Sequence, residues 1–277
     1  MADHPAPPTR AGTGSGPLLQ QWRRRRRLSQ LQLASDSGVS TRHLSFVETG
    51  RARPSRELLL HLAEHLDVPL RERNRMLLAA GFAPAYSEEP LDAPEMAAVL
   101  ASVQLVLRGH EPFPALVMNR HFELVAANRA LDVLTEGIAP ELLVPPTNVM
   151  RAALHPDGLA RRVVNLAEYR GHALTTLRRA LDAGPDPVLA ELHRELSAYP
   201  VPPGTEVVDT PVAALVLPIR LRAAGPGTTE MTFFSTVATF GSPRDITLSE
   251  LAIETFFPAD AATEAALRAR AARRETA

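Results

Sequence analysis

The feature that most constrains the fold is a glycine corner between two short helical runs near the start of the chain. Ser37-Gly38-Val39 separates the two runs, and glycine can adopt the positive φ that ends a helix in a tight corner. Ser29 and Ser40 are placed to cap the amino ends of the two helices. Two short helices joined in this way form a helix-turn-helix. Because ordinary bundles also contain such corners, the corner alone indicates only a compact helical unit.

Helical signals continue on both sides of this corner and predict a bundle of five helices over residues 17–82. The first helix is expected over about 18–27, where it ends in the run RRRRR. The second and third helices flank the corner. Ser55 is placed to cap a leucine-rich fourth helix, and a fifth helix is expected over about 70–80.

The charge of the chain is unevenly distributed, although its net value is only −1. All 30 basic residues are arginine. Residues 17–82 carry 12 Arg and 6 acidic side chains, whereas residues 83–277 carry 17 Arg and 24 acidic side chains. A basic head on an acidic body indicates that the head binds a polyanion. The run Arg23–Arg27 is equally compatible with a solvated helix end.

In a helix-turn-helix, the amino-terminal end of the second helix enters the major groove of DNA. The polar side of the helix after Ser40 is therefore the expected reading face. Its candidate base contacts are Thr41, Arg42 and Ser45, with Phe46 at the edge. Arginine can bind guanine O6 and N7, and a threonine or phenylalanine can touch a thymine methyl. Phe46 is equally compatible with a place in the core.

A second set of residues is placed to bind the phosphates of DNA. These residues are Arg26, Ser29, Gln30, Arg51 and Arg53. They flank the two helices of the corner, where the backbone of a bound duplex would run. Glu48 is instead expected to pair with an arginine of the same domain, with Arg23 as the candidate, because DNA repels carboxylates.

The stretch LSQLQLASDSGVSTRHLSFVETGRARPSRELLLHLAEHLDVP, residues 28–69, resembles the lambda-repressor-like (XRE-type) helix-turn-helix family. The resemblance rests on Ser29-Gln30, on Gly38-Val39-Ser40 and on the exit from Glu48 to Ser55. It implies sequence-specific binding to double-stranded DNA. By this resemblance, Gln30 contacts the DNA backbone and the third helix faces the bases. Phe46 stands where the family usually has a polar reader.

Beyond residue 94 the sequence pattern changes, and it predicts a second domain that makes the chain α+β. Residues 1–16 are expected to be a disordered leader and residues 83–94, with three prolines and several acids, a linker. The stretch PFPALVMNRHFELVAAN predicts two short strands. Helices are expected over roughly 149–199, and the runs VAALVLPIRLRA, EMTFFSTVATF and LAIETFF predict further strands before an Ala/Arg-rich terminal helix.

Two of these strands carry information about the second domain, 95–277. Pro218 has no N–H, so its strand is expected at an edge of the sheet or at a bulge. The run MTFFSTVATF has apolar residues on both faces, which indicates burial on both sides or the wall of a cavity, with ordinary core as the alternative. The candidate cavity-lining residues are Leu116, Met118, Phe122, Leu217, Ile219 and Phe233.

The second domain, over about 94–268, resembles the ligand-binding domain of MmyB-like regulators. The resemblance is carried by PALVMNRHFELVAAN, NVMRAALHPDG and FFSTVATFGSPRDITLSELAIETFFPAD. It implies a PAS-like fold, in which helices cover one face of a five-stranded antiparallel sheet and enclose a pocket. It also implies an apolar ligand, with a fatty acid as a candidate.

No residue pattern in the sequence indicates catalysis, a metal site or a cofactor. The chain has no cysteine, and it contains no nucleophile elbow, P-loop or dinucleotide fingerprint. His61 and His65 have a metal-ligand spacing but no third ligand. Asn128 is expected to cap a helix and His155 to lie in a turn. No apolar run approaches the ~20 residues that a membrane-spanning helix needs.

The sequence therefore predicts a cytoplasmic transcription regulator that binds its DNA operator as a homodimer and senses an apolar small molecule. In the first alternative, the second domain is a ligand-free dimerisation or protein-docking module. In the second, it is an enzyme tethered to DNA, which would need a cluster of titratable groups that the sequence does not show.

Overall fold

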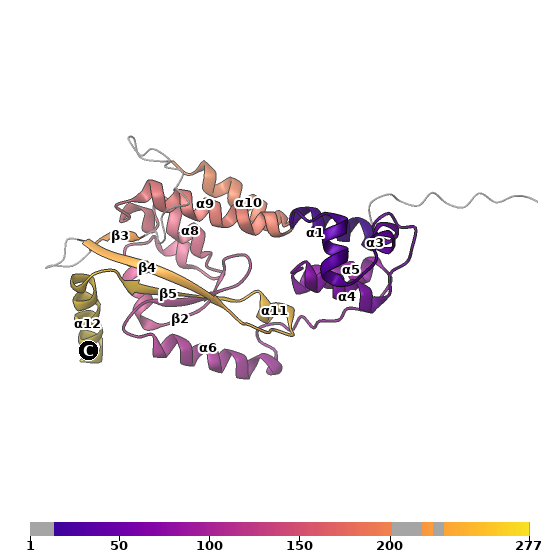
Figure 1. Ribbon diagram of the computed structural model, residues 1–277. Helices are drawn as coiled ribbons and strands as arrows, with labels where there is room; N and C mark the ends of the chain where they lie inside the picture. Colours follow the sequence, from indigo (N-terminus) through magenta and orange to yellow (C-terminus); the bar gives the residue numbers. More distant parts are fainter. Residues whose placement is uncertain (1–13, 201–217, 224–229, 277) are drawn as a thin grey trace, which may run out of the picture. The chain divides into compact units, whose positions relative to one another are not determined.

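The computed structural model of the chain describes residues 14–200, 218–223 and 230–276. Its internal contacts divide the chain into two units (Figure 1). The first unit runs to Glu88 and includes residues 243–246, and the second contains residues 89–242 and 247–277. The predicted α+β fold, a five-helix region followed by a five-stranded antiparallel sheet with helices, is confirmed.

The first unit contains five helices that share one apolar core. They are α1 (Ser15–Arg25), α2 (Gln30–Ser37), α3 (Thr41–Glu48), α4 (Arg56–His65) and α5 (Leu70–Ala79). The predicted caps form: the hydroxyls of Ser29, Ser40 and Ser55 accept hydrogen bonds from backbone N–H groups at 3.1, 3.2 and 3.1 Å. Each cap satisfies a donor that the first turn of a helix leaves unpaired. Leu19, Leu33, Leu44, Leu62 and Leu77 are fully buried in the core.

The first helix begins at Ser15, inside the segment 1–16 that the sequence predicts as a leader. Gly16 permits this start, because α1 lies directly against the end of α3. A Cβ atom at Gly16 would come within 2.3 Å of the Val47 carbonyl oxygen. Only glycine allows two backbones to approach so closely.

The beginning of the predicted linker, 83–94, is held by the first unit. The Asn74 side chain accepts hydrogen bonds from the backbone N–H groups of Ala85 and Tyr86 at 2.8 and 3.2 Å. Its amide also donates to the Tyr86 carbonyl at 2.8 Å. This buried asparagine therefore fixes the chain that leaves α5, and the first unit extends to Glu88.

The second unit is built on a sheet with the strand order β2-β1-β5-β4-β3, in which every neighbouring pair is antiparallel. The strands are β1 (Ala115–Met118), β2 (Leu124–Ala127), β3 (Ile219–Arg222), β4 (Glu230–Thr239) and β5 (Ala252–Pro258). The strand that follows Pro218 lies at an edge, as predicted. The part of that predicted strand before Pro218 lies outside the described residues.

Helices cover both faces of the sheet, whereas the family resemblance implied only one covered face (Figure 1). On one face, Val103 and Leu107 of α6 (Ala97–Gly109) pack on Ala115, Val117 and Ile253. The other face carries the larger core. Its covering elements are η2 (Arg129–Leu131), α7 (Asp132–Thr135), η3 (Pro140–Leu143), α8 (Val149–Leu154), η4 (Leu159–Arg161), α9 (Leu166–Ala183) and α10 (Pro187–Ala198).

The remaining elements are η1 (Pro94–Met96), α11 (Ile246–Ser249) and the terminal helix α12 (Ala261–Glu275), which Asp260 caps by accepting from the Thr263 N–H at 2.7 Å. Leu267 of α12 packs into the larger core. Across the described parts of the chain, every helix is too short or too polar to cross a bilayer.

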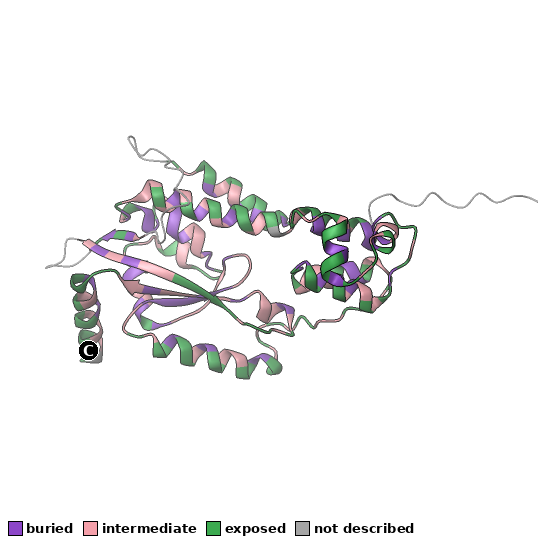
Figure 2. Ribbon diagram, in the orientation of Figure 1, coloured by how far each residue is buried: buried purple, intermediate pink, exposed green. Residues whose placement is uncertain are grey.

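The strand β4 changes from buried to exposed along its length (Figure 2). Met231 and Phe233 are buried, whereas Val237 is 58% exposed. Phe234, on the opposite face, stacks on Phe257 at 5.1 Å between ring centroids. The expectation that β4 is buried on both sides is therefore wrong for the second half of the strand, because Val237 faces a cavity. The other expectation, that this strand forms part of a cavity wall, agrees with the structure.

The structure contradicts the role predicted for Asn128 and agrees with the place predicted for His155. Asn128 occupies an N-cap position without capping. Its amide instead braces the chain, accepting from the Ala115 N–H at 3.0 Å and donating to the carbonyls of Phe113 and Leu107 at 2.7 and 3.1 Å. The capping prediction is wrong because the side chain points to the strand before it. His155 lies in a turn, where its Nδ1 accepts from the Asp157 N–H at 3.0 Å.

Candidate DNA-binding face and ligand cavity

The glycine corner has the geometry of a helix-turn-helix. Gly38 ends α2 with a φ of +67°, and Ser40, two residues later, caps the start of α3. Leu44 and Val47 of α3 point into the core. The opposite side of α3 carries Arg42 and His43, which are exposed, and Thr41, Ser45 and Phe46, which are half-buried. The predicted reading face is therefore open to a DNA groove. His43 is exposed next to Arg42, although the sequence did not single it out; the inward phase of Leu44 and Val47 was the signal that could have revealed this exposure.

Phe46 lies outside the apolar core of the first unit. The guanidinium carbon of Arg42 lies 5.4 Å from the centroid of the Phe46 ring. A cation at this distance over an aromatic face is attracted by the ring. Phe46 therefore orients Arg42 on the exposed side of α3.

Beneath this face lies a buried polar cluster centred on Glu48, which is 3% exposed. Arg23 of α1 donates to both Glu48 oxygens, at 2.6 and 2.7 Å, as predicted for this pair. Gln30 of α2 donates to the same carboxylate at 2.7 Å. Burial alone raises the pKa of Glu48, but the hydrogen bonds from Arg23 and Gln30 outweigh it and hold the pKa below its usual value. The cluster ties three helices together.

Four of the five predicted phosphate-binding residues make hydrogen bonds within the domain. The Ser29 hydroxyl caps α2, and the Gln30 amide binds Glu48. Arg26 donates to the carbonyls of Leu66 and Asp67, both at 2.7 Å, and Arg53 donates to the Ala80 carbonyl at 3.2 Å. These bonds orient the side chains, and contacts with phosphate remain predictions. Arg51 is exposed just beyond α3.

The two histidines with metal-ligand spacing have structural roles. His61 Nε2 lies 2.8 Å from the Ser37 carbonyl oxygen, at the end of α2. His65 Nδ1 lies 2.9 Å from the His61 carbonyl oxygen. Within residues 14–200, 218–223 and 230–276, no group of three potential metal-ligating side chains occurs. The histidine pair therefore supports packing within the first unit.

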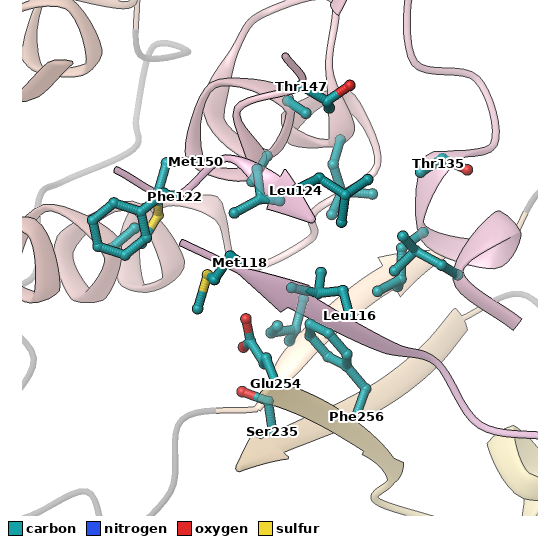
Figure 3. A pocket seen from close by; sticks show the side chains of 18 of the residues that line it. Leu116, Met118, Phe122, Leu124, Thr135, Thr147, Met150, Ser235, Glu254 and Phe256 are labelled. Atoms are coloured by element: carbon teal, nitrogen blue, oxygen red, sulfur yellow. The ribbon is translucent and has the colours of Figure 1, made fainter. Parts of the chain in front are cut away.

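The second unit contains a cavity of about 280 Å³ between the sheet and the helices over its larger core (Figure 3). Its wall is mainly apolar. Five of the six predicted lining residues contribute to it, namely Leu116, Met118, Phe122, Ile219 and Phe233. The sixth, Leu217, lies outside the described residues. The size is near the lower end of the range of small-molecule sites, roughly 300 Å³.

The backbone of Phe122 is strained, and this strain directs its side chain into the cavity. Its φ is +61°, a value that bulky residues rarely adopt. The turn between β1 and β2 holds it there: the Asn119 side chain accepts from the N–H groups of His121 and Glu123 at 2.9 and 3.0 Å. A strained residue at the wall of a cavity is typical of a functional site.

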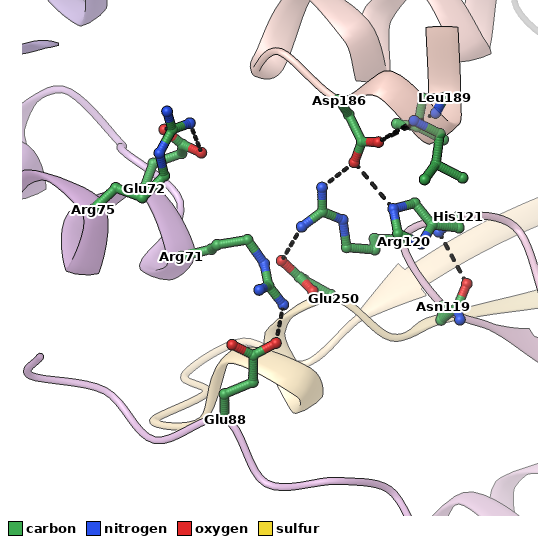
Figure 4. Close-up of polar contacts among 11 residues, drawn as sticks. Arg71, Glu72, Arg75, Glu88, Asn119, Arg120, His121, Asp186, Leu189 and Glu250 are labelled. Carbon is green, nitrogen blue, oxygen red and sulfur yellow. Dashed lines mark hydrogen bonds and ion pairs between the residues drawn. The ribbon is translucent and has the colours of Figure 1, made fainter. Parts of the chain in front are cut away.

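Asp186 fastens this turn to the start of α10 (Figure 4). Its carboxylate binds the Arg120 guanidinium and lies 3.0 Å from His121 Nε2. It also accepts from the backbone N–H groups of Val188 and Leu189 at 2.9 and 3.2 Å. Burial alone raises its pKa, but the hydrogen bonds from Leu189, Arg120 and His121 lower the pKa of Asp186 to about 2. A charged Asp186 therefore stabilises the turn that presents Phe122.

The matches to known families agree with this division into a reading face and a cavity. Residues 19–73 match the helix-turn-helix family. Residues 99–269, more than half of the chain, match the MmyB-like transcription regulator ligand binding domain. The chain belongs to the MmyB-like transcription regulators. It is a DNA-binding helix-turn-helix regulator with a ligand-binding domain. A search among curated proteins gave no match.

The cavity of this MmyB-like regulator also holds polar groups that the sequence did not reveal. Glu254 of β5 and Ser235 of β4 project from the sheet, and Tyr169, His172 and Thr176 project from α9. Burial raises the pKa values of Glu254 and Tyr169. Burial and, to a smaller degree, the charge of Arg179 lower the pKa of His172. In LAIETFF, the alternation of a strand puts Glu254 on the same face as Phe256 and puts Ile253 and Thr255 on the other face. This alternation was the sequence signal that could have placed Glu254 in the cavity wall.

Proposed function

We propose that this MmyB-like regulator acts in the cytoplasm, reads an operator as a homodimer and senses an apolar small molecule bound in the cavity of its second unit. The observation that carries the sensing role is the cavity itself. Its wall is mainly apolar, and strained Phe122 is held against it by a dedicated turn. A fatty acid is the candidate that the family resemblance suggests, and its acyl chain suits such a wall.

The effector acts by shifting an equilibrium between two arrangements of the DNA-binding units. A ligand changes such an equilibrium only as far as its affinities for the two states differ. To change operator affinity about tenfold, it therefore has to bind one arrangement at least about tenfold more tightly than the other. The closing of the helices over the ligand is the step that we expect to distinguish the two states.

The homodimer follows from the small size of one reading face. The exposed side of α3 reaches only a few base pairs, because the helix contains 8 residues. Two copies related by a two-fold axis would read two half-sites about 34 Å apart. We therefore expect the operator to be a palindrome, which selection of bound sites from random DNA would reveal.

Arg42→Ala is expected to weaken operator binding by about 1–3 kcal/mol and to relax the preference at one base pair, because it removes a bidentate contact to guanine. Competition between operator and random duplexes, over a series of salt concentrations, measures both effects. An equal loss of affinity on operator and random DNA would remove Arg42 from the base-reading residues.

Arg51→Ala is the matched comparison, because Arg51 is an exposed arginine just beyond the same helix. It is expected to weaken binding to all sequences alike and to reduce the slope of log affinity against log salt by about one unit. A change of base preference in this variant would move Arg51 from the phosphate contacts to the readers.

Mass spectrometry of the denatured, purified protein tests the sensing role. A co-purified apolar molecule that changes operator affinity supports it. If no molecule co-purifies and no panel of acyl-chain compounds raises the melting temperature, the sensing role is wrong. The second unit would then be a ligand-free dimerisation or protein-docking module, which the dimer equilibrium of the isolated protein would show.

A further inference from the structure

Glu254 stands at the centre of the sheet face that forms the floor of the cavity. It lies on β5, the middle strand, with Leu116 of β1 as its partner on one side and Val237 of β4 on the other. All three residues line the cavity. A carboxyl group thus interrupts an apolar row that crosses three strands.

The carboxyl group points into the cavity. Figure 3 shows it beside the Ser235 hydroxyl and directed toward the Met118 side chain. The nearby Ser235 hydroxyl lowers the pKa of Glu254, but burial outweighs this effect and raises it. A hydrogen-bonding group in this place would be costly to bury without a partner, and a ligand can supply that partner.

No positive charge balances this carboxyl group in the described wall of the cavity. Among its described lining residues, Glu254 is the only acid, His172 is the only basic side chain, and none is an arginine. The low pKa of His172 keeps its imidazole neutral near pH 7. The undescribed segments 201–217 and 224–229 contain no Arg, Lys or His in their sequence. Basic side chains are therefore scarce in the described wall of the cavity, although the chain contains 30 arginines.

We infer that the polar end of the effector is a hydrogen-bond donor without negative charge, such as a hydroxyl or an amino group, and that it binds the Glu254 carboxyl group. This inference rests on the proposed sensing role and specifies the chemical class of the effector. The apolar remainder of the molecule lies against Leu116, Phe122 and Phe256. The acyl chain of a fatty acid therefore fits, but its carboxylate does not.

The physical reason is the cost of burying a negative charge. A carboxylate loses part of its hydration in a mainly apolar cavity, and it needs a cation or several donors to compensate. Here it would meet a second carboxyl group, which disfavours the charged form of both. A hydroxyl donates to Glu254 without any charge, and an ammonium group forms an ion pair with the ionised carboxylate.

The place of Glu254 also suits the head group of an amphiphile. Its partner Val237 lines the cavity and is 58% exposed, so solvent reaches the cavity wall beside the carboxyl group. A polar head at this position can stay partly hydrated while the chain is buried. Ser235 provides a second polar group next to it.

Binding of three matched ten-carbon amphiphiles to the full chain tests the inference. Decanol, decylamine and decanoate are titrated below their critical micelle concentrations at about pH 7.5, where decanoate is ionised. Isothermal titration calorimetry and the shift in melting temperature measure their affinities. We expect decanol and decylamine to bind about tenfold or more tightly than decanoate.

Glu254→Gln removes the ionisable group and keeps the shape of the side chain. We expect it to weaken decylamine about tenfold or more, to strengthen decanoate, and to change decanol less than about threefold. Glu95→Gln is the matched control, because Glu95 is exposed and does not line the cavity. It should leave all three affinities unchanged. The affinities of the natural protein for the three compounds test the inference without any variant. The inference can therefore be contradicted even if Glu254→Gln folds poorly.

Three results would overturn the inference. If decanoate binds most tightly and Glu254→Gln weakens it, Glu254 acts as a protonated donor to a carboxylate. If all three compounds bind equally in both proteins, the cavity selects only the chain, and the sensing role survives without a head-group site. If none binds to the natural protein, the sensing role fails together with the inference.

Discussion

Replacing Glu48 with alanine is expected to lower the free energy of unfolding of the helix-turn-helix unit by about 3–5 kcal/mol, because it leaves a buried arginine without its counter-charge. Arg23 is 7% exposed and has its two shortest side-chain hydrogen bonds to Glu48. Gln30 loses its acceptor as well. Since α1, α2 and α3 meet at this carboxylate, we also expect the variant to lose operator binding.

Urea unfolding followed by tryptophan fluorescence measures this change in the full chain. Trp22 is the only tryptophan, and it lies in the core of the first unit, so its emission reports on that unit alone. Glu64→Ala is the control, because Glu64 is an exposed residue of α4, and its replacement should cost about 0.5 kcal/mol or less. Equal effects of the two replacements would show that the buried cluster does not stabilise the unit.

The same carboxylate should give the first unit a distinctive sensitivity to acid. Its folded-state pKa lies below that of an unfolded glutamate, so its contribution to stability is complete above the unfolded pKa of ~4.3. The contribution is lost as the pH falls through the folded-state pKa. The alanine variant lacks this group, so its stability should fall less steeply over the same pH range. A parallel decline in both proteins would assign the acid sensitivity to other carboxylates.

Phe233→Ala is expected to destabilise the second unit by about 3–5 kcal/mol, because it removes a fully buried aromatic side chain and leaves a void. Phe233 is 0% exposed, and it belongs both to the larger core and to the wall of the cavity. The void would join the existing cavity of about 280 Å³. We therefore expect the variant to bind longer apolar chains in preference to those that the natural protein binds.

Differential scanning calorimetry of the full chain measures the loss of stability, and titration with alcohols of increasing chain length measures the change of preference. Val237→Ala is the matched control on the same strand. Val237 also lines the cavity, but it is 58% exposed, so its truncation should cost less than about 1 kcal/mol. A shift in chain-length preference caused equally by Val237→Ala would show that Phe233 does not limit the length of the cavity.

The sequence determined the local features of both units. Ser29, Ser40 and Ser55 cap the helices as predicted, because a cap depends on a side chain and a backbone group only three residues apart. The glycine corner and the edge strand after Pro218 follow from the backbone chemistry of single residues. Leu116, Met118, Ile219 and Phe233 were predicted as cavity-lining residues because strand alternation assigns each one to a face, whereas Phe122 lies in the turn between β1 and β2.

Only the tertiary structure decided which distant residues meet. Gln30 reads in the sequence as a phosphate ligand, and in the folded chain its amide binds Glu48. Asn128 reads as a helix cap, and in the folded chain it braces Ala115 and Phe113. Glu254 becomes a cavity group because β5 pairs with β1 on one side and with β4 on the other. A sequence period fixes the face on which a side chain lies, but strand order and register fix its neighbours, and those neighbours determine what the cavity can bind.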